Sequence, residues 1–159
     1  MTISFILNGE DIMIEAEGGV RLVDILRKNF SLIGTKTGCD IGYCGACSVI
    51  INGEMVKSCL IPAFKAHGSE IITIEGISQT DEYKDLLIGF KDAKSESCGI
   101  CTSGKMLAVE ALLSKYQRPS RENILFAFQG IRCRCTSVND LVRGINSVVE
   151  QRRKRLNEH

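Results

Sequence analysis

Two short apolar runs open the chain, and Asn8-Gly9 separates them. The first run covers residues 3–7, and the second covers residues 12–16, where apolar and polar positions alternate. An Asn-Gly pair between two such runs is typical of a tight hairpin, so two antiparallel strands are predicted. In residues 20–30 the apolar positions recur at helical spacing, which predicts a helix lying across that hairpin.

A second hairpin is predicted in residues 48–56, where Asn52-Gly53 again separates two strand-like segments. Residues 70–76, with the sequence EIITIEG, are rich in β-branched side chains and predict a fifth strand. The N-terminal half of the chain therefore indicates an α+β unit with a small sheet and one main helix.

Further along the chain, strand alternation disappears and helical spacing takes over. Ser120 and Ser137 stand where they could cap helices, Asp140 has capping-box spacing from Ser137, and Gly130 stands where a helix could end. Four helices of this length can close a bundle. They are predicted for residues 81–93, 103–116, 120–130 and 137–156.

The change of period also marks the expected domain boundary, between Gly76 and Asp81. Residues 1–76 are expected to form the α+β domain, and residues 77–159 are expected to form an all-α domain. No internal repeat and no low-complexity segment interrupts this division.

Composition and charge exclude several function classes. Hydrophobic residues make up 44% of the chain and charged residues 25%, which is typical of a globular protein with a buried core. Twenty Lys and Arg against nineteen Asp and Glu give a net charge of +1, so a nucleic-acid partner is not expected. The only basic run, residues 152–155, is interpreted as the end of a final helix, where cations interact favourably with the negative end of the helix dipole. A partner-binding site is the alternative.

The N-terminus lacks the features of a secretory signal, and no apolar run reaches the roughly 18 residues of a membrane span. A cytoplasmic location without a membrane span is therefore expected. In that compartment thiols stay reduced, so the eight cysteines are interpreted as metal ligands. A disulfide scaffold is the alternative, but a bridge between Cys133 and Cys135, which have a single residue between them, would be strained.

The first four cysteines have a spacing known from iron–sulfur proteins. Three follow a C-x4-C-x2-C pattern, and the fourth comes after 11 more residues. This is the plant-type spacing for a [2Fe-2S] cluster, in which a loop wraps around the cluster. Glycines between them suit such a loop because they allow positive φ and close approach to the cluster. The residues are Cys39, Cys44, Cys47 and Cys59, with Gly38, Gly42 and Gly45.

The second four cysteines form a C-x2-C pair, Cys98 and Cys101, and a C-x-C pair, Cys133 and Cys135. If each pair enters a helix, the two pairs can converge at one end of a bundle, where free N–H groups and the helix dipole stabilise thiolates. The spacing alone leaves iron–sulfur and zinc open, since both accept four thiolates.

Taken together, these motifs resemble the iron–sulfur subunit of the molybdenum hydroxylases, the family of xanthine dehydrogenase, aldehyde oxidoreductase and carbon monoxide dehydrogenase. GCDIGYCGAC and Cys59 are similar to the family's ferredoxin-like domain, and CGICTSG and CRCTS are similar to its CGFCTPG and CRCTGY motifs. The resemblance covers nearly the whole chain, with both motif sets in the family's order.

The resemblance implies a β-grasp ferredoxin domain followed by a four-helix bundle, each holding one 2Fe-2S cluster. It assigns Cys39, Cys44, Cys47 and Cys59 to the first cluster, and Cys98, Cys101, Cys133 and Cys135 to the second. The cofactor-contacting residues expected on this basis are Gly38, Gly42, Gly45, Gly99 and Cys135. In the family the second cluster lies toward molybdopterin in a large partner subunit, and the first lies toward a FAD-binding subunit.

Several positions depart from the family pattern around the second site. Ser97 replaces a glutamine that contacts the pterin, and Ser103 replaces a proline. Ile131-Arg132 replaces Asn-Leu, and Ser137-Val138 replaces Gly-Tyr. Either the partner subunit is unusual, or its pterin is contacted by other residues.

The expected function is electron transfer within a multi-subunit oxidoreductase, with no complete active site in this chain. His67 and His159, the only histidines, are expected at the surface without a catalytic role. Cluster potentials depend on nearby hydrogen bonds, burial and charge, and Lys36, Arg132 and Arg134 are candidates for favouring the reduced forms, with ordinary solvated charges as the alternative. The alternatives are a free-standing two-cluster ferredoxin and a zinc-stabilised structural module. The substrate of the complex is not encoded here.

Overall fold

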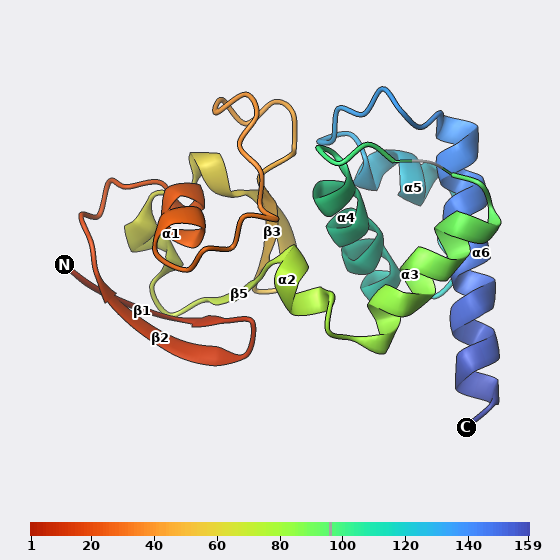
Figure 1. The fold of residues 1–159 in the computed structure, drawn as a ribbon, viewed down its shortest axis with the longest axis horizontal. Helices are drawn as coiled ribbons and strands as arrows, with labels where there is room; N and C mark the ends of the chain where they lie inside the picture. Colours follow the sequence, from red (N-terminus) through yellow and green to blue (C-terminus); the bar gives the residue numbers. More distant parts are fainter. Residues whose placement is uncertain (96) are drawn as a thin grey trace.

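The computed structural model describes residues 1–95 and 97–159, and it has a sheet-containing half and a helical half. Figure 1 shows the two halves side by side, with the loops that carry the cysteines at one edge of both. Among the residues described, no helix is both long enough and apolar enough to cross a membrane.

Five strands form one mixed sheet in the order β2-β1-β5-β3-β4. Both predicted hairpins are confirmed, since β1 pairs with β2 and β3 with β4, each antiparallel across its Asn-Gly turn. In the centre, β5 runs parallel to β1 and antiparallel to β3, so it joins the two hairpins. The strands are β1 (Thr2–Leu7), β2 (Glu10–Glu15), β3 (Ser48–Ile51), β4 (Glu54–Lys57) and β5 (Glu70–Ile72).

The predicted helix after the first hairpin is α1 (Leu22–Lys28). Its buried side chains, with Leu22 and Leu26 fully enclosed, pack on Ile3 and Phe5 of β1 and form the core of this half. Two short 3-10 helices, η1 (Ser58–Leu60) and η2 (Ala63–Ala66), connect β4 to β5. Burial of one face of α1 against the sheet thus fixes where the following cysteine loop begins.

The strand predicted for residues 70–76 is wrong in its second half. Strand β5 ends at Ile72, and residues Ile74–Ile77 form the short helix α2. The side chain of Asn8 accepts from the Thr73 backbone N–H (2.8 Å) and donates to the Thr73 hydroxyl (3.0 Å). These bonds hold Thr73 out of the sheet ladder, so the chain turns where its β-branched composition alone would continue the strand.

All four helices predicted for the second half are confirmed, and they are α3 (Asp81–Asp92), α4 (Thr102–Lys115), α5 (Arg121–Ala127) and α6 (Val138–Asn157). Ser120 caps α5 in a capping box with Asn123, and Ser137 caps α6 by accepting from Asp140 N. Helix α5 ends at Ala127, three residues before the predicted Gly130.

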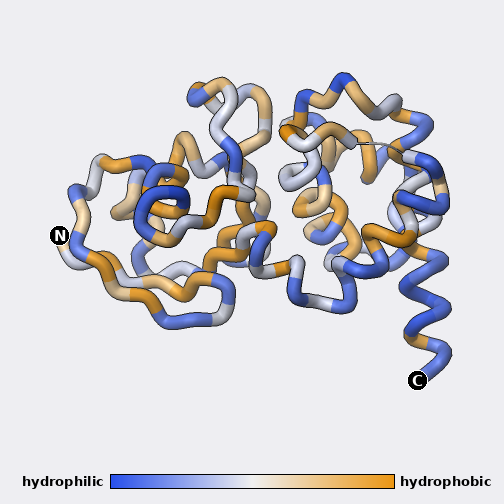
Figure 2. The backbone as a smooth tube through the Cα atoms, viewed as in Figure 1, coloured by the Kyte–Doolittle hydropathy of each residue, from blue (hydrophilic) through white to orange (hydrophobic). Residues whose placement is uncertain are grey.

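Helices α3 and α6 cross at close range because small residues lie at the contact. A Cβ added at Gly89 of α3 would come within 2.6 Å of Val148, and one at Gly144 of α6 would come within 2.6 Å of Phe90. Figure 2 shows hydrophobic stretches inside both halves and hydrophilic last turns of α6, which extend beyond its neighbours. The helical core also includes residues from outside α3–α6, namely Ile50, Ile74 and Ile77.

Candidate functional site

The first four cysteines lie on the loop between α1 and β3 and on η1. Cys39 and Cys44 are half-buried on the loop, whereas Cys47, just before β3, and Cys59, in η1, are buried. Cys47 and Cys59 pack with Val23 of α1, so the helix supports the floor of the site. All four are free thiols.

Backbone N–H groups of this loop point at its sulfurs. Tyr43 N and Cys44 N each donate to the Cys39 Sγ at 3.2 Å, and Ala46 N donates to the Cys44 Sγ at 3.5 Å. The hydrogen bond from the Cys44 backbone is the main cause that lowers the pKa of Cys39 to about 6. Burial instead raises the pKa of the Cys47 thiol to about 11. The exposed side of the loop thus favours a thiolate more than its floor does.

The glycines of the loop allow its tight path. A Cβ at Gly38 would lie 2.9 Å from the Cys44 Sγ, so a side chain there would press on a sulfur. Gly45 has φ +79°, and a Cβ there would lie only 2.4 Å from the Gly130 carbonyl oxygen. Gly42 also has positive φ (+74°). By contrast, an added Cβ at Gly99 would meet nothing within 4 Å, and its contact with a cofactor stays a prediction.

The second four cysteines converge, as the spacing predicted. The Sγ of Cys101 lies 3.2 Å from those of Cys98 and Cys133 and 3.4 Å from that of Cys135. Cys133 and Cys135 are 3.1 Å apart at sulfur, and Cys98 N donates to the Cys135 Sγ at 3.1 Å. Cys101 is the N-cap residue of α4, whereas Cys135 comes two residues before Ser137, the N-cap of α6. Only the C-x2-C pair therefore enters a helix directly.

Burial and hydrogen bonds shift the pKa values of the second four thiols in different directions. The Cys101 backbone N–H lowers the pKa of Cys98, and burial raises the pKa of Cys101. Burial also opposes ionisation of Cys133, but hydrogen bonds from Cys135 and Cys101, together with the charge of Lys105, lower its pKa to about 7. Cys98 and Cys135 are exposed, so this set reaches the surface of the protein.

The two cysteine-bearing segments touch through their backbones. Arg132 N, next to Cys133, donates to the carbonyl oxygen of Cys44 at 2.9 Å. The Arg132 guanidinium carbon also lies 4.7 Å from the centre of the Tyr43 ring, within the range of a cation–π contact. The close approach of Gly45 to Gly130 belongs to the same contact. The structure thus joins the two sites directly.

Lys105 is a site residue that the sequence patterns did not single out. It lies on α4 with only 1% of its surface exposed, and its Nζ donates to Ser97 Oγ (3.2 Å) and to Thr136 Oγ1 (2.5 Å). The sequence feature that could have identified it is a lysine within the otherwise uncharged residues 103–109 of a predicted helix. A charge in such a stretch is usually paired or functional, because burying it alone is costly.

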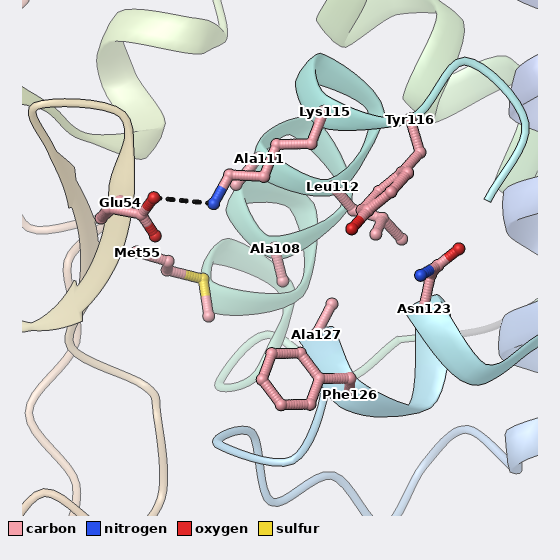
Figure 3. A pocket seen from close by; sticks show the side chains of 10 residues that line it. All are labelled: Glu54, Met55, Ala108, Ala111, Leu112, Lys115, Tyr116, Asn123, Phe126 and Ala127. Carbon is pink, nitrogen blue, oxygen red and sulfur yellow. Dashed lines mark hydrogen bonds and ion pairs between the residues drawn. The ribbon is translucent and has the colours of Figure 1, made fainter. Parts of the chain in front are cut away.

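A cavity of about 470 Å³ lies away from the cysteines, between β4, α4 and α5. Figure 3 shows Met55, Tyr116 and Phe126 around it, with the ion pair between Lys115 and Glu54 spanning from the helix to the strand at 2.8 Å. Its lining contains no cysteine, so it is separate from both sulfur sites.

The donor chemistry fits two iron–sulfur clusters. Each half supplies four free thiols, the first loop adds backbone N–H groups aimed at sulfur, and Gly38 leaves room where a side chain would press on one. Comparison with known proteins agrees. A 2Fe-2S iron-sulfur cluster binding domain matches residues 20–96, and a [2Fe-2S] binding domain matches residues 73–146.

Named relatives match nearly the whole chain. It is 40% identical over 151 residues to the nicotinate dehydrogenase small FeS subunit of Eubacterium barkeri, covering 95% of this chain and 96% of that protein. It is 36% identical over 153 residues to one nicotinate dehydrogenase subunit of Pseudomonas putida, and the match covers 96% of this chain and 98% of that protein. The crystal structure of quinoline 2-oxidoreductase from Pseudomonas putida 86 contains a chain that superposes with a TM-score of 0.85 at 35% identity, covering 96% of each chain.

The aldehyde oxidoreductase of Desulfovibrio gigas also superposes with a TM-score of 0.85, at 28% identity, but there the match covers 98% of this chain and only 17% of that one. The fold and its two sulfur sites define an iron–sulfur protein that is one part of an oxidoreductase. This chain belongs to the iron–sulfur subunits of the molybdenum hydroxylase family. The resemblance noted in its motifs is thereby confirmed, and the matching family models favour iron–sulfur over the zinc alternative.

Proposed function

We propose that this chain relays electrons from a large molybdopterin-binding subunit to a FAD-binding subunit through two 2Fe-2S clusters, in a cytoplasmic complex. The observation that carries the proposal is the direct backbone contact between the two segments that carry the two sets of four thiols, made where Arg132 N donates to the Cys44 carbonyl. When bound, each cluster takes up and releases one electron at a time.

Two sets of ligands are proposed, one in each half of the chain. The residues are Cys39, Cys44, Cys47 and Cys59 for the first cluster, and Cys98, Cys101, Cys133 and Cys135 for the second. Backbone N–H groups donate to the sulfurs of Cys39 and Cys135 and favour the negative charge that the thiolates bring. The strand order supports a β-grasp domain over residues 1–76, and α3–α6 support a four-helix bundle over residues 77–159.

Exposed apolar side chains beside each site support docking on both sides. Ile41, on the first cysteine loop, is 74% exposed, and Ile100, between Cys98 and Cys101, is 67% exposed. Apolar side chains at such positions are typical of surfaces that partner subunits cover. We propose that the molybdopterin subunit docks on the Ile100 side and the flavin subunit on the Ile41 side, as the resemblance implies.

Metal analysis and electron paramagnetic resonance test this function. We expect about four irons and four acid-labile sulfides per chain, with two distinct signals after reduction, because each 2Fe-2S cluster contributes one. The variant Cys135→Ser should lose or alter the second-site signal and keep the first, and Cys59→Ser should do the reverse. Zinc without sulfide, or equal loss of both signals in each variant, would contradict the proposal.

A native pull-down tests the partners separately. The proposal expects co-purification with two further subunits, one that contains molybdenum and one that contains flavin. Recovery as a monomer that holds both clusters, without molybdenum or flavin, would instead indicate a free-standing two-cluster ferredoxin.

A further inference from the structure

Arg132 belongs to the second cysteine segment, directly before Cys133, but it contacts the first cysteine loop in two ways. Its backbone N–H donates to the Cys44 carbonyl at 2.9 Å. Its guanidinium carbon lies 4.7 Å from the centre of the Tyr43 ring, which is a cation–π contact. Arg132 therefore holds two successive residues of the other loop, one through its backbone and one through its side chain.

The two residues that Arg132 holds are also the ones that donate hydrogen bonds to Cys39. Tyr43 N and Cys44 N each donate to the Cys39 Sγ at 3.2 Å. Both contacts of Arg132 are thus made with the dipeptide that points two N–H groups at one sulfur. Hydrogen bonds weaken steeply when their geometry is lost, so the position of this dipeptide decides how well both N–H groups reach the sulfur.

Tyr43 lies in an exposed part of the loop, where packing alone restrains it little. Tyr43 is 58% exposed, and its neighbour Ile41 is exposed as well. The backbone contact between the two segments is tighter, since a Cβ at Gly45 would come within 2.4 Å of the Gly130 carbonyl oxygen. The cation–π contact therefore restrains the part of the loop that the tight backbone contact does not reach.

Hydrogen bonds to a sulfur stabilise its more negative state. A 2Fe-2S cluster gains one negative charge when it is reduced, so N–H groups that donate to a ligand sulfur favour the reduced form and raise the reduction potential. A contact that keeps two N–H groups on the Cys39 sulfur acts in that direction. It can shift the equilibrium by no more than it favours its own geometry, which is roughly two- to fivefold for an exposed cation–π contact.

We propose that Arg132 is a positioning residue for the first cluster, because its contact with the Tyr43 ring keeps the Tyr43 and Cys44 N–H groups on the Cys39 sulfur and so raises the reduction potential of that cluster. This inference rests on the proposed function. It adds that a residue of the second cysteine segment helps to set the potential of the first cluster. A higher potential there favours electron transfer from the second cluster to the first, which is the proposed direction.

The test is a redox titration of the full chain with both clusters bound, followed by electron paramagnetic resonance. Tyr43→Leu removes the ring, changes no charge and keeps the backbone N–H. It should lower the equilibrium constant for reducing the first cluster about two- to fivefold, which is about 20–40 mV for one electron, and leave the second potential unchanged. Tyr43→Phe is the matched control, since it keeps the ring and should keep the wild-type potential.

A double-mutant cycle separates the contact from the charge of Arg132. Arg132→Leu removes the contact and also an exposed charge, which water and salt screen. It should lower the first potential less in the Tyr43→Leu background than in the wild type, because the contact is already lost there. Equal shifts in the two backgrounds, or an unshifted first potential in Tyr43→Leu, would overturn the role of Arg132.

Iron and sulfide analysis of each variant accompanies the titrations. Both replaced side chains are exposed, and the backbone contact between Gly45 and Gly130 stays in place, so every variant should keep about four irons and four sulfides. Absence of two signals in the wild type would overturn the proposed function itself, whereas an unshifted first potential in Tyr43→Leu would overturn only the role of Arg132.

Discussion

At the scale of single residues, Gly45 decides how closely the two cysteine segments approach. Its φ of +79° is unfavourable for any residue with a Cβ, and a Cβ would also lie 2.4 Å from the Gly130 carbonyl oxygen. Gly53, in the second hairpin, has nearly the same φ, +82°, but an added Cβ there would meet nothing within 4 Å. The two glycines therefore share the backbone requirement and differ only in the contact.

Replacing each by alanine separates these effects. Gly53→Ala should lower the free energy of unfolding by about 1–2 kcal/mol, the cost of a left-handed residue with a Cβ. Gly45→Ala should cost about 1–3 kcal/mol more, because the Gly130 backbone must move away. Urea unfolding of the cluster-containing protein measures both values. Equal losses in the two variants would show that the contact with Gly130 adds nothing.

The residues around the sites show what sequence can predict about them. The spacing of the cysteines, with each pair expected to enter a helix, predicted that Cys98, Cys101, Cys133 and Cys135 can converge. They do converge, although the C-x-C pair ends two residues before the N-cap of α6. Lys105 escaped prediction because its burial depends on which way α4 faces, and that is set by packing between distant segments. The structure explains why Ser137 stands where the family pattern has glycine, since the Ser137 hydroxyl caps α6.

At the scale of elements, α6 is held to α3 by charge as well as by close packing. Asp85 of α3 is buried, and its Oδ2 lies 2.8 Å from the Arg155 Nη2 and 3.6 Å from the Arg152 Nε. Arg152 also pairs with Glu110 of α4 at 2.9 Å. These pairs occupy two cations of the basic run, which supports its interpretation as the end of a helix.

Asp85→Ala should destabilise the protein by about 2–3 kcal/mol, because it leaves Arg152 and Arg155 without their shared carboxylate in a partly buried place. Glu150→Ala is the control, since it breaks only the exposed pair with Arg153 on α6 itself and should cost less than about 1 kcal/mol. Urea unfolding midpoints measure the difference. Similar midpoints for the two variants would contradict a structural role for the Asp85 pairs.

Element boundaries were predictable where local chemistry determines them and less so elsewhere. Both Asn-Gly hairpins and the Ser120 cap follow from neighbouring residues alone. The end of β5 does not, because it depends on a side chain 65 positions away, Asn8, which binds Thr73. Residues 73–76 were predicted as strand, but tertiary contacts make Thr73 the N-cap of α2 and put residues 74–76 in that helix.

At the scale of the whole molecule, the two halves share structure at their boundary. Helix α2 spans the proposed division between residues 76 and 77, and its Ile74 and Ile77 belong to the helical core together with Ile50 of β3. The two family models also overlap, over residues 73–96. The helical half therefore completes its core with residues that precede its own first long helix.

This sharing predicts how isolated fragments of the helical half behave. The free energy of unfolding should be about 2 kcal/mol higher for a fragment of residues 73–159 than for one of residues 77–159, because the longer fragment keeps the buried side chain of Ile74. Urea unfolding measures this difference. Both fragments lack Gly45 and Ile50, so the long helices α3–α6 lose the same contacts with these two residues in each. The variant Ile74→Ala in the longer fragment is the matched control and should bring its stability down to that of the shorter one. Equal stability of the two unaltered fragments would mean that residues 77–159 form a complete domain by themselves.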